Sequence, residues 1–165
     1  MDRFEKYLNL TYRYLSIRNR SVKEIRDYLT KKKAEPEVIE KLIHVLIEQK
    51  FLNDEIFARM WISSRARFRP RGKQLLKIEL QQKGIAKDII EQVLAEVHED
   101  VPDELTQAKS LIERRVERLA DQPRQVVYQK VGSFLARRGF SWGTTKKAID
   151  ACLEKRVAET TPREV

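Results

Sequence analysis

The chain has 165 residues, of which 36% are charged and 41% hydrophobic, and its formal net charge is +9. No apolar run approaches the roughly 18–20 residues that span a bilayer, and the N-terminal residues lack a signal-peptide core. The single cysteine, Cys152, excludes an internal disulfide framework. These features exclude an integral membrane protein and a disulfide scaffold, and we expect a cytoplasmic protein.

Residues 1–50 are predicted to form three helices. Ser21, with Glu24 three residues later, forms a capping-box pattern for the second helix. Pro36 suits the first turn of the third helix. The apolar residues at helical spacing are Phe4, Tyr7, Leu8, Tyr14, Leu15, Ile25, Leu29, Ile39, Leu42, Ile43 and Leu46.

Residues 51–99 are also predicted to form three helices. Asn53 is the expected N-cap of the first, and Pro70 is expected near the first turn of the second. The apolar residues of this segment are Phe57, Trp61, Phe68, Leu76, Leu80, Ile89, Ile90, Val93, Leu94 and Val97. We expect Phe57 and Trp61 to pack in the core. For Phe68 we favour anchoring of the link between helices over stacking on a base.

Residues 100–157 are predicted to contain a long charged helix, ERRVERLAD, that breaks near Pro123, and then a helix with Val127, Val131, Phe134 and Leu135. Ser141 should cap a last helix that ends near Arg156, and residues 158–165 should form a frayed tail. The segment 99–124 carries no motif that indicates a role.

Three stretches align without a gap at offsets of 51 and 55 residues: LTKKKAEPEVIEKLI (29–43), LQQKGIAKDIIEQVL (80–94) and LARRGFSWGTTKKAI (135–149). Each begins with a leucine that we expect to be buried. The fifth position is Lys33, Gly84 and Gly139, and a glycine there suits a residue at positive φ just after a helix end. The apolar residues that follow are Leu42, Ile43 and Leu46, then Val93, Leu94 and Val97, then Ala148, Ile149 and Cys152. The pattern predicts an all-α fold of three tandem three-helix repeats in an elongated, curved molecule.

The positive charge is concentrated in residues 59–87, which hold nine Lys or Arg and one acid, Glu79, for a net charge of +8. The centre of this segment, RARFRPRGK (65–73), has a basic residue at every odd position. The alternation resembles a strand, but Pro70 and the helical flanks indicate a helix end, a turn and a helix start. A charge excess this local favours a surface for a polyanion or an acidic partner over a solvated face.

The stretch FLNDEIFARMWISSRARFRPRGKQLLKIELQQKGI (51–85) resembles the central repeat of the RecX family, regulators of the RecA recombinase. The matching elements are Phe51-Leu52-Asn53-Asp54, Phe57-Ala58-Arg59, Arg65-Ala66-Arg67, Pro70-Arg71-Gly72 and Glu79-Leu80-Gln81-Gln82-Lys83-Gly84-Ile85. Residues 15–29 and 134–140 are similar to parts of the family's outer repeats. The link at 67–72 is more basic than the family's usual K-G-(Y/F)-G-P.

The resemblance implies a non-enzymatic protein that binds the RecA–DNA filament along its groove. Such proteins hinder filament growth and thereby reduce RecA ATPase, strand exchange and co-protease activity in DNA recombination and repair, and many bind DNA weakly. Our candidate surface for the RecA filament and DNA comprises Arg59, Arg65, Arg67, Arg69, Arg71, Lys73, Lys77 and Lys83, with Arg137 and Arg138 as second choices.

No catalytic constellation or phosphate-binding loop is present in the sequence, so we predict no enzyme activity and no cofactor. His44 and His98 stand without further ligands at metal-binding spacing, so no metal site is expected. His44 should lie on a helix surface, and Cys152 should belong to the core.

Two alternatives remain open. The first is a stand-alone helical DNA-binding protein whose basic surface contacts phosphates; Gln74, Gln81 and Gln82 give thin support for base reading. The second is an inert helical scaffold. We expect a monomer, because no heptad seam is long enough for a coiled coil.

Overall fold

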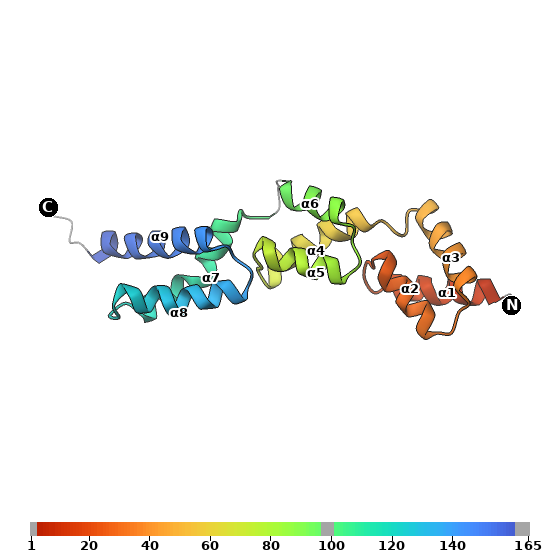
Figure 1. Cartoon of the computed structure of the whole chain (residues 1–165), viewed down its shortest axis with the longest axis horizontal. Helices are drawn as coiled ribbons and strands as arrows, with labels where there is room; N and C mark the ends of the chain where they lie inside the picture. The colour runs from red at the N-terminus through yellow and green to blue at the C-terminus, as the bar shows by residue number, and fades with distance from the viewer. Residues whose placement is uncertain (1–2, 97–100, 161–165) are drawn as a thin grey trace. The chain divides into compact units, whose positions relative to one another are not determined.

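The computed structural model describes residues 3–96 and 101–160, and within these residues it contains nine α-helices and no strand. The all-α prediction is therefore confirmed for the described part of the chain. The helices are α1 (Arg3–Leu15), α2 (Val22–Lys31), α3 (Pro36–Glu48), α4 (Asp54–Phe68), α5 (Lys73–Gln82), α6 (Lys87–Ala95), α7 (Glu104–Arg118), α8 (Arg124–Arg137) and α9 (Trp142–Thr160). Figure 1 shows them in chain order.

The chain divides by compactness into two units, each assembled from two separate stretches of sequence. Unit 1 comprises residues 1–61 and 79–95, and unit 2 comprises residues 62–78 and 96–165. Helices α4 and α5 therefore each contribute one part to unit 1 and another to unit 2. The boundaries expected from sequence, at 50/51 and 99/100, stay predictions.

Unit 1 is built around the bundle of α1, α2 and α3 (Figure 1). Ser21 caps α2 by accepting from the Glu24 N–H, and the Glu24 side chain accepts in return from the Ser21 N–H, which confirms the capping box. Pro36 is the first residue of α3, as predicted. The buried core of the bundle consists of Ile25, Leu29, Ala34, Ile39, Leu42, Ile43, Leu46 and Leu52.

Unit 2 is built around α7, α8 and α9, which pack against one another (Figure 1). Ser141 Oγ accepts from the Thr144 N–H at 3.1 Å, which confirms the predicted cap at the start of α9. The buried core consists of Ala108, Ile112, Val116, Val127, Val131, Leu135, Phe140, Ala148 and Ile149.

The repeat inferred from sequence reappears as the same helix ending in three places. The fifth-position residues have positive φ: 62° at Lys33, 78° at Gly84 and 82° at Gly139. The N–H of the next residue donates to the carbonyl of the repeat leucine: Ala34 to Leu29 at 3.1 Å, Ile85 to Leu80 at 3.1 Å and Phe140 to Leu135 at 3.2 Å. This is the Schellman ending, and all three leucines are fully buried.

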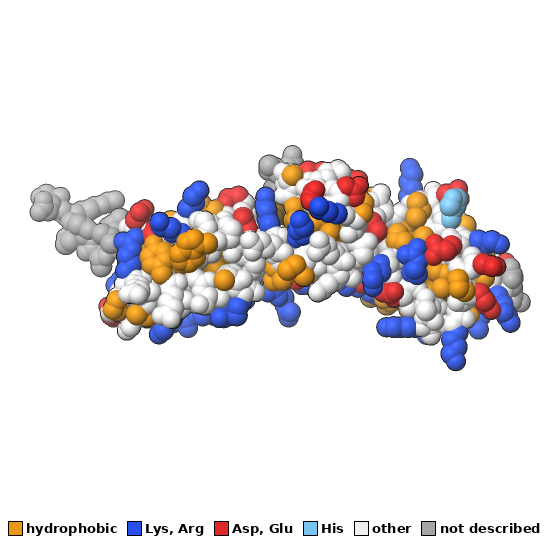
Figure 2. Space-filling model, viewed as in Figure 1, with side chains coloured by type: hydrophobic (Ala, Val, Ile, Leu, Met, Phe, Trp, Pro, Cys, Tyr) orange, Lys and Arg blue, Asp and Glu red, His pale blue; other side chains and the backbone are white. Residues whose placement is uncertain are grey.

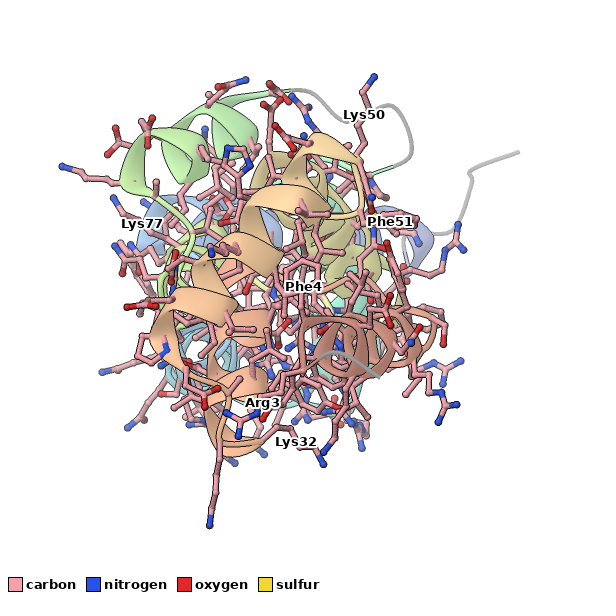
Figure 3. All side chains as sticks on the ribbon, turned by 90° about the vertical axis from the view of Figure 1, so that its right-hand side faces the viewer. Arg3, Phe4, Lys32, Lys50, Phe51 and Lys77 are labelled. Atoms are coloured by element: carbon pink, nitrogen blue, oxygen red, sulfur yellow. The ribbon has the colours of Figure 1, made fainter. Side chains whose placement is uncertain are left out.

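Lys50 ends α3 in the same backbone conformation, with φ 61°, and the sequence did not indicate it. The Phe51 N–H donates to the Leu46 carbonyl at 2.8 Å. Figure 3 shows the Lys50 side chain extending away from the ribbon. The long polar side chain therefore stays in solvent while the backbone turns.

Two predicted helix ends are wrong. Helix α5 begins at Lys73, three residues after Pro70. Helix α9 continues to Thr160, beyond the expected end at Arg156, because residues 157–160 contain no Gly or Pro to stop it. The rest of the predicted tail, residues 161–165, lies outside the described residues, as do Val97 and His98.

Candidate functional site

The basic stretch RARFRPRGK adopts the helix–turn–helix-start geometry expected from sequence. Arg65 and Arg67 lie in the last turn of α4. The carbonyl of Gly72 accepts from the Leu76 N–H at 3.1 Å, so Gly72 rather than Pro70 precedes the first turn of α5. Glu104 Oε1 of α7 accepts from the Lys73 N–H at 3.0 Å. This carboxylate satisfies a helix N–H that lacks a partner within α5, and its charge suits the helix N-terminus.

The link between α4 and α5 is held against the end of α8 by backbone contacts within unit 2. The Gly72 N–H donates to the Arg138 carbonyl at 2.9 Å. A Cβ on Gly72 would lie 2.1 Å from the Gly139 carbonyl oxygen, and one on Gly139 would lie 2.3 Å from Leu75 Cβ. Only glycine therefore fits at these two positions, where the link and the end of α8 meet. This approach brings the basic link next to Arg138.

Four arginines from three parts of unit 2 form what we call the arginine cluster: Arg69 and Arg71 of the link, Arg115 of α7 and Arg138 at the end of α8. Burial lowers the pKa of Arg138, and the positive charges of Arg71, Arg115 and Arg69 lower it further, although a guanidinium stays charged at any physiological pH. Like charges brought together in this way repel one another, and an anion would relieve that repulsion.

Two members of the arginine cluster, Arg115 and Arg138, lie over the ring of Phe134. The guanidinium carbon of Arg115 lies 4.0 Å from the centre of the Phe134 ring, and that of Arg138 lies 4.8 Å from it. Stacking on a ring face leaves the N–H groups at the guanidinium edge available for an anion. Within the described residues, no ion pair joins Arg69, Arg115 or Arg138 to a carboxylate.

The remaining candidate cations of unit 2 are exposed or half-buried. Arg67, Lys73 and Arg137 are exposed, whereas Arg65 and Lys77 are half-buried. Figure 2 shows Lys and Arg side chains, in blue, along the edge formed by α8. Unit 2 thus holds eight of the ten candidates: Arg65, Arg67, Arg69, Arg71, Lys73, Lys77, Arg137 and Arg138.

The two candidates in unit 1 are engaged by acids. Arg59 Nη2 lies 2.7 Å from Glu55 Oε1, and Lys83 Nζ lies 2.7 Å from Glu24 Oε1. Lys83 also sits 5.0 Å from the centre of the Trp61 ring. Both cations have their charge balanced inside the fold, so they are less suited than the arginine cluster to bind an outside anion.

The aromatic predictions have opposite outcomes. Phe57 is buried and stacks on half-buried Trp61 with ring centres 5.8 Å apart, which confirms packing. Phe68 was expected to anchor the link and is instead 74% exposed, so that prediction is wrong. The backbone contact between Gly72 and Arg138 holds the link, which leaves Phe68 at the end of α4 facing solvent.

His44 and Cys152 lie where the sequence predicted. His44 is exposed on α3, 3.6 Å from Glu48. Cys152 is half-buried against the core of unit 2, and burial raises the pKa of its thiol. No group of potential metal ligands occurs in the described residues. Among the described helices, none combines the length and apolar character needed to cross a bilayer.

Sequence reasoning missed Arg115 and Phe134 as parts of the site. Arg115 lies in the ERRVER run of α7, whose charge was noted without a role, and Phe134 was assigned only to packing. Their association depends on which face α7 turns toward α8. No local spacing reports that orientation.

Three family models match the chain in succession: the first, second and third three-helix domains of RecX match residues 8–46, 53–94 and 102–149. The chain belongs to the RecX family. Among its curated relatives are proteins named "Regulatory protein RecX" from Bacillus pumilus (35% identity) and Bacillus subtilis strain 168 (32% identity). Each match covers 90% of this chain and 56% of the relative. The chain therefore spans little more than half the length of these RecX relatives.

Solved RecX structures have the same fold. The crystal structure of RecX from Lactobacillus salivarius superposes with a TM-score of 0.81 at 24% identity, covering 92% of this chain and 97% of that one. A crystal structure titled regulatory protein RecX gives a TM-score of 0.76 at 25% identity, covering 90% and 72%. The prediction of three tandem three-helix repeats is confirmed for this RecX-family chain by the family models and the fold together.

Proposed function

We propose that this chain regulates RecA by binding RecA nucleoprotein filaments, and that it inhibits RecA ATPase, strand exchange and co-protease activity. Membership of a family whose members are named regulatory proteins supports a role exerted by binding rather than by catalysis. In this proposal the protein acts as a monomer in the cytoplasm, with the filament as its main partner.

The observation that carries the proposal is the arginine cluster. Arg69, Arg115 and Arg138 have no carboxylate partner within the described residues, so their charge is available to a second molecule. A RecA filament on DNA offers phosphates and acidic side chains, and the planar fork of arginine binds either group with two parallel hydrogen bonds.

The test is the ATPase rate of RecA on saturating single-stranded DNA, titrated with this protein far below the concentration of DNA sites. We expect inhibition at that substoichiometric level. The variant Arg69→Gln/Arg138→Gln should lose most of it. The matched control Lys6→Gln/Arg13→Gln removes two exposed charges from α1 and should inhibit like the unaltered protein.

The alternative is a stand-alone DNA-binding protein, which the same three arginines, Arg69, Arg115 and Arg138, favour. It predicts that ATPase falls only when the protein is abundant enough to cover the DNA. That result, or full inhibition by Arg69→Gln/Arg138→Gln, would overturn the proposed filament contact.

A further inference from the structure

Helix α7 presents different charged residues to α8 and to α9. Its buried residues are Ala108, Ile112 and Val116. Toward α9, Glu113 Oε1 lies 2.7 Å from Lys155 Nζ, so this carboxylate is engaged within unit 2. Toward α8, α7 presents Arg115 and Arg118. The helix thus places arginines, without acids, where it meets α8.

A groove of about 270 Å³ lies between α7 and α8 and is lined by Arg115, Arg118, Leu119, Lys130 and Val131. We call it the α7–α8 groove. Three of its five lining residues are cations, and none is an acid. All three cations are exposed, whereas Val131 is buried and Leu119 is half-buried. The groove is therefore electropositive along its walls and open to solvent.

Arg115 connects this groove to the arginine cluster, because it lines the groove and also shares the Phe134 ring with Arg138. The continuous set of cations runs from the link, past the end of α8, to the facing sides of α7 and α8. Its members are Arg69, Arg138, Arg115, Arg118 and Lys130, none of which forms an ion pair with a carboxylate of the described residues. Like charges at close quarters repel one another, and an anionic ligand bound along the row would neutralise that repulsion.

We propose that the α7–α8 groove binds the phosphodiester backbone of nucleic acid. This inference rests on the proposed function and deepens it, by assigning the DNA of the filament, rather than its protein, to the third repeat. A phosphodiester chain carries one negative charge per nucleotide and so matches a row of cations that have no carboxylate partner within the described residues. Four of the five cations are arginines, whose forks suit phosphate oxygens. The groove offers no Asn or Gln, so binding should be independent of base sequence.

The experiment measures fluorescence anisotropy of a labelled oligothymidylate of about 20 nucleotides at several salt concentrations, without RecA. The variant Arg115→Gln/Arg118→Gln/Lys130→Gln should bind about tenfold or more weakly, and the slope of log K against log salt should fall by about 2, since each phosphate contact on a single strand contributes about 0.7. The matched control Arg114→Gln/Lys146→Gln/Lys147→Gln removes three exposed cations of unit 2 outside the groove and should change affinity less than about threefold. Equal losses in the two variants, or no loss in either, would overturn the assignment.

A second variant distinguishes a lost phosphate contact from misfolding. Arg115 stacks on Phe134, whereas Arg118 and Lys130 are exposed, so Arg118→Gln/Lys130→Gln should melt like the unaltered protein and still lose affinity. Competition separates nucleic acid from an acidic protein. Unlabelled oligothymidylate should displace the probe at a lower charge concentration than poly-L-glutamate, and equal competition would assign the groove to carboxylates instead.

The two proposals fail in different ways. If the groove variant loses oligothymidylate binding yet still inhibits RecA ATPase below DNA saturation, the proposed function stands and the groove is dispensable for it. If oligothymidylate binding depends on the groove but substoichiometric inhibition is absent, only the proposed function falls.

Discussion

Gly72 and Gly139 meet backbone to backbone: a methyl group on Gly72 would come within 2.1 Å of the Gly139 carbonyl oxygen. The Gly72 N–H donates at the same place to the Arg138 carbonyl at 2.9 Å. The two glycines lie in segments far apart in sequence, and their approach fixes the basic link against α8. The geometry of the arginine cluster therefore depends on a pair of residues that carry no charge.

Replacing Gly72 with Ala should destabilise unit 2. The added methyl group meets backbone, which cannot rotate away, and overpacking of this kind costs about 1–3 kcal/mol. Gly143→Ala is the control, because a Cβ there comes no closer than 3.9 Å to its neighbour and α9 should gain up to about 1 kcal/mol of helix propensity. Thermal unfolding followed by circular dichroism distinguishes them, and equal melting temperatures would contradict the tight approach.

Glu24 should make unit 1 sensitive to acid. Burial tends to raise the pKa of this carboxyl, but hydrogen bonds from Arg18 and Lys83 outweigh it and lower the pKa to about 2. An unfolded chain has a glutamate pKa of about 4.3, so the ionised form is favoured in the fold. Ionised Glu24 therefore contributes of the order of 2–3 kcal/mol to the free energy of unfolding of unit 1. This contribution is complete above about pH 5 and is lost as pH falls toward 2.

The measurement compares the unaltered protein with Glu24→Gln by urea unfolding between pH 2 and pH 7. Trp61 lies in unit 1 and Trp142 in unit 2, so a Trp142→Phe background makes Trp61 fluorescence report unit 1 alone. The stability difference between the two proteins should shrink on acidification. A difference that stays constant across this range would contradict the assignment to Glu24.

Lys33→Gly should stabilise unit 1. Lys33 has φ 62° at the position where the other two repeats carry glycine, and a side chain in this conformation costs about 1–2 kcal/mol, part of which glycine loses again through its freedom when unfolded. We expect a net gain of several tenths of a kcal/mol. The converse change, Gly84→Ala, should destabilise, because its Cβ would lie 2.5 Å from Lys23 Cβ. Shifts of the same sign in both variants would refute this account.

The loss of stability should be much larger in Leu80→Ala than in Phe68→Ala, although both variants remove a large apolar side chain. Leu80 is fully buried, and its truncation should cost about 2–5 kcal/mol. Phe68 is 74% exposed, so its truncation should leave the melting temperature nearly unchanged. A marked loss of stability in Phe68→Ala would mean that this ring packs against the protein in solution.

The repeat was predictable because its signals are local. A buried leucine followed four positions later by a residue at positive φ belongs to one helix end, and Leu29, Leu80 and Leu135 all obey the pattern. The capping box at Ser21 is equally local. Local spacing was enough to place the helices and most of the core.

The site was only partly predictable because its decisive contacts join distant segments. Pro70 was expected to open α5, but Glu104 of α7 caps the helix at Lys73 instead. Arg115 enters the arginine cluster through Phe134 of α8. In both cases a partner from the third repeat decides the outcome, and a pattern confined to residues 59–87 does not contain that partner.

The division of α4 and α5 between the two units has a consequence for the order of events during synthesis on the ribosome. In unit 1 Lys83 contacts Glu24, and residues 62–78, which belong to unit 2, are synthesised between these two residues. The core of the α1–α3 bundle lies within residues 25–52, whereas residues 79–95 complete unit 1 only after residues 62–78 of unit 2 have been made. The two units are therefore not completed strictly one after the other in the order of translation.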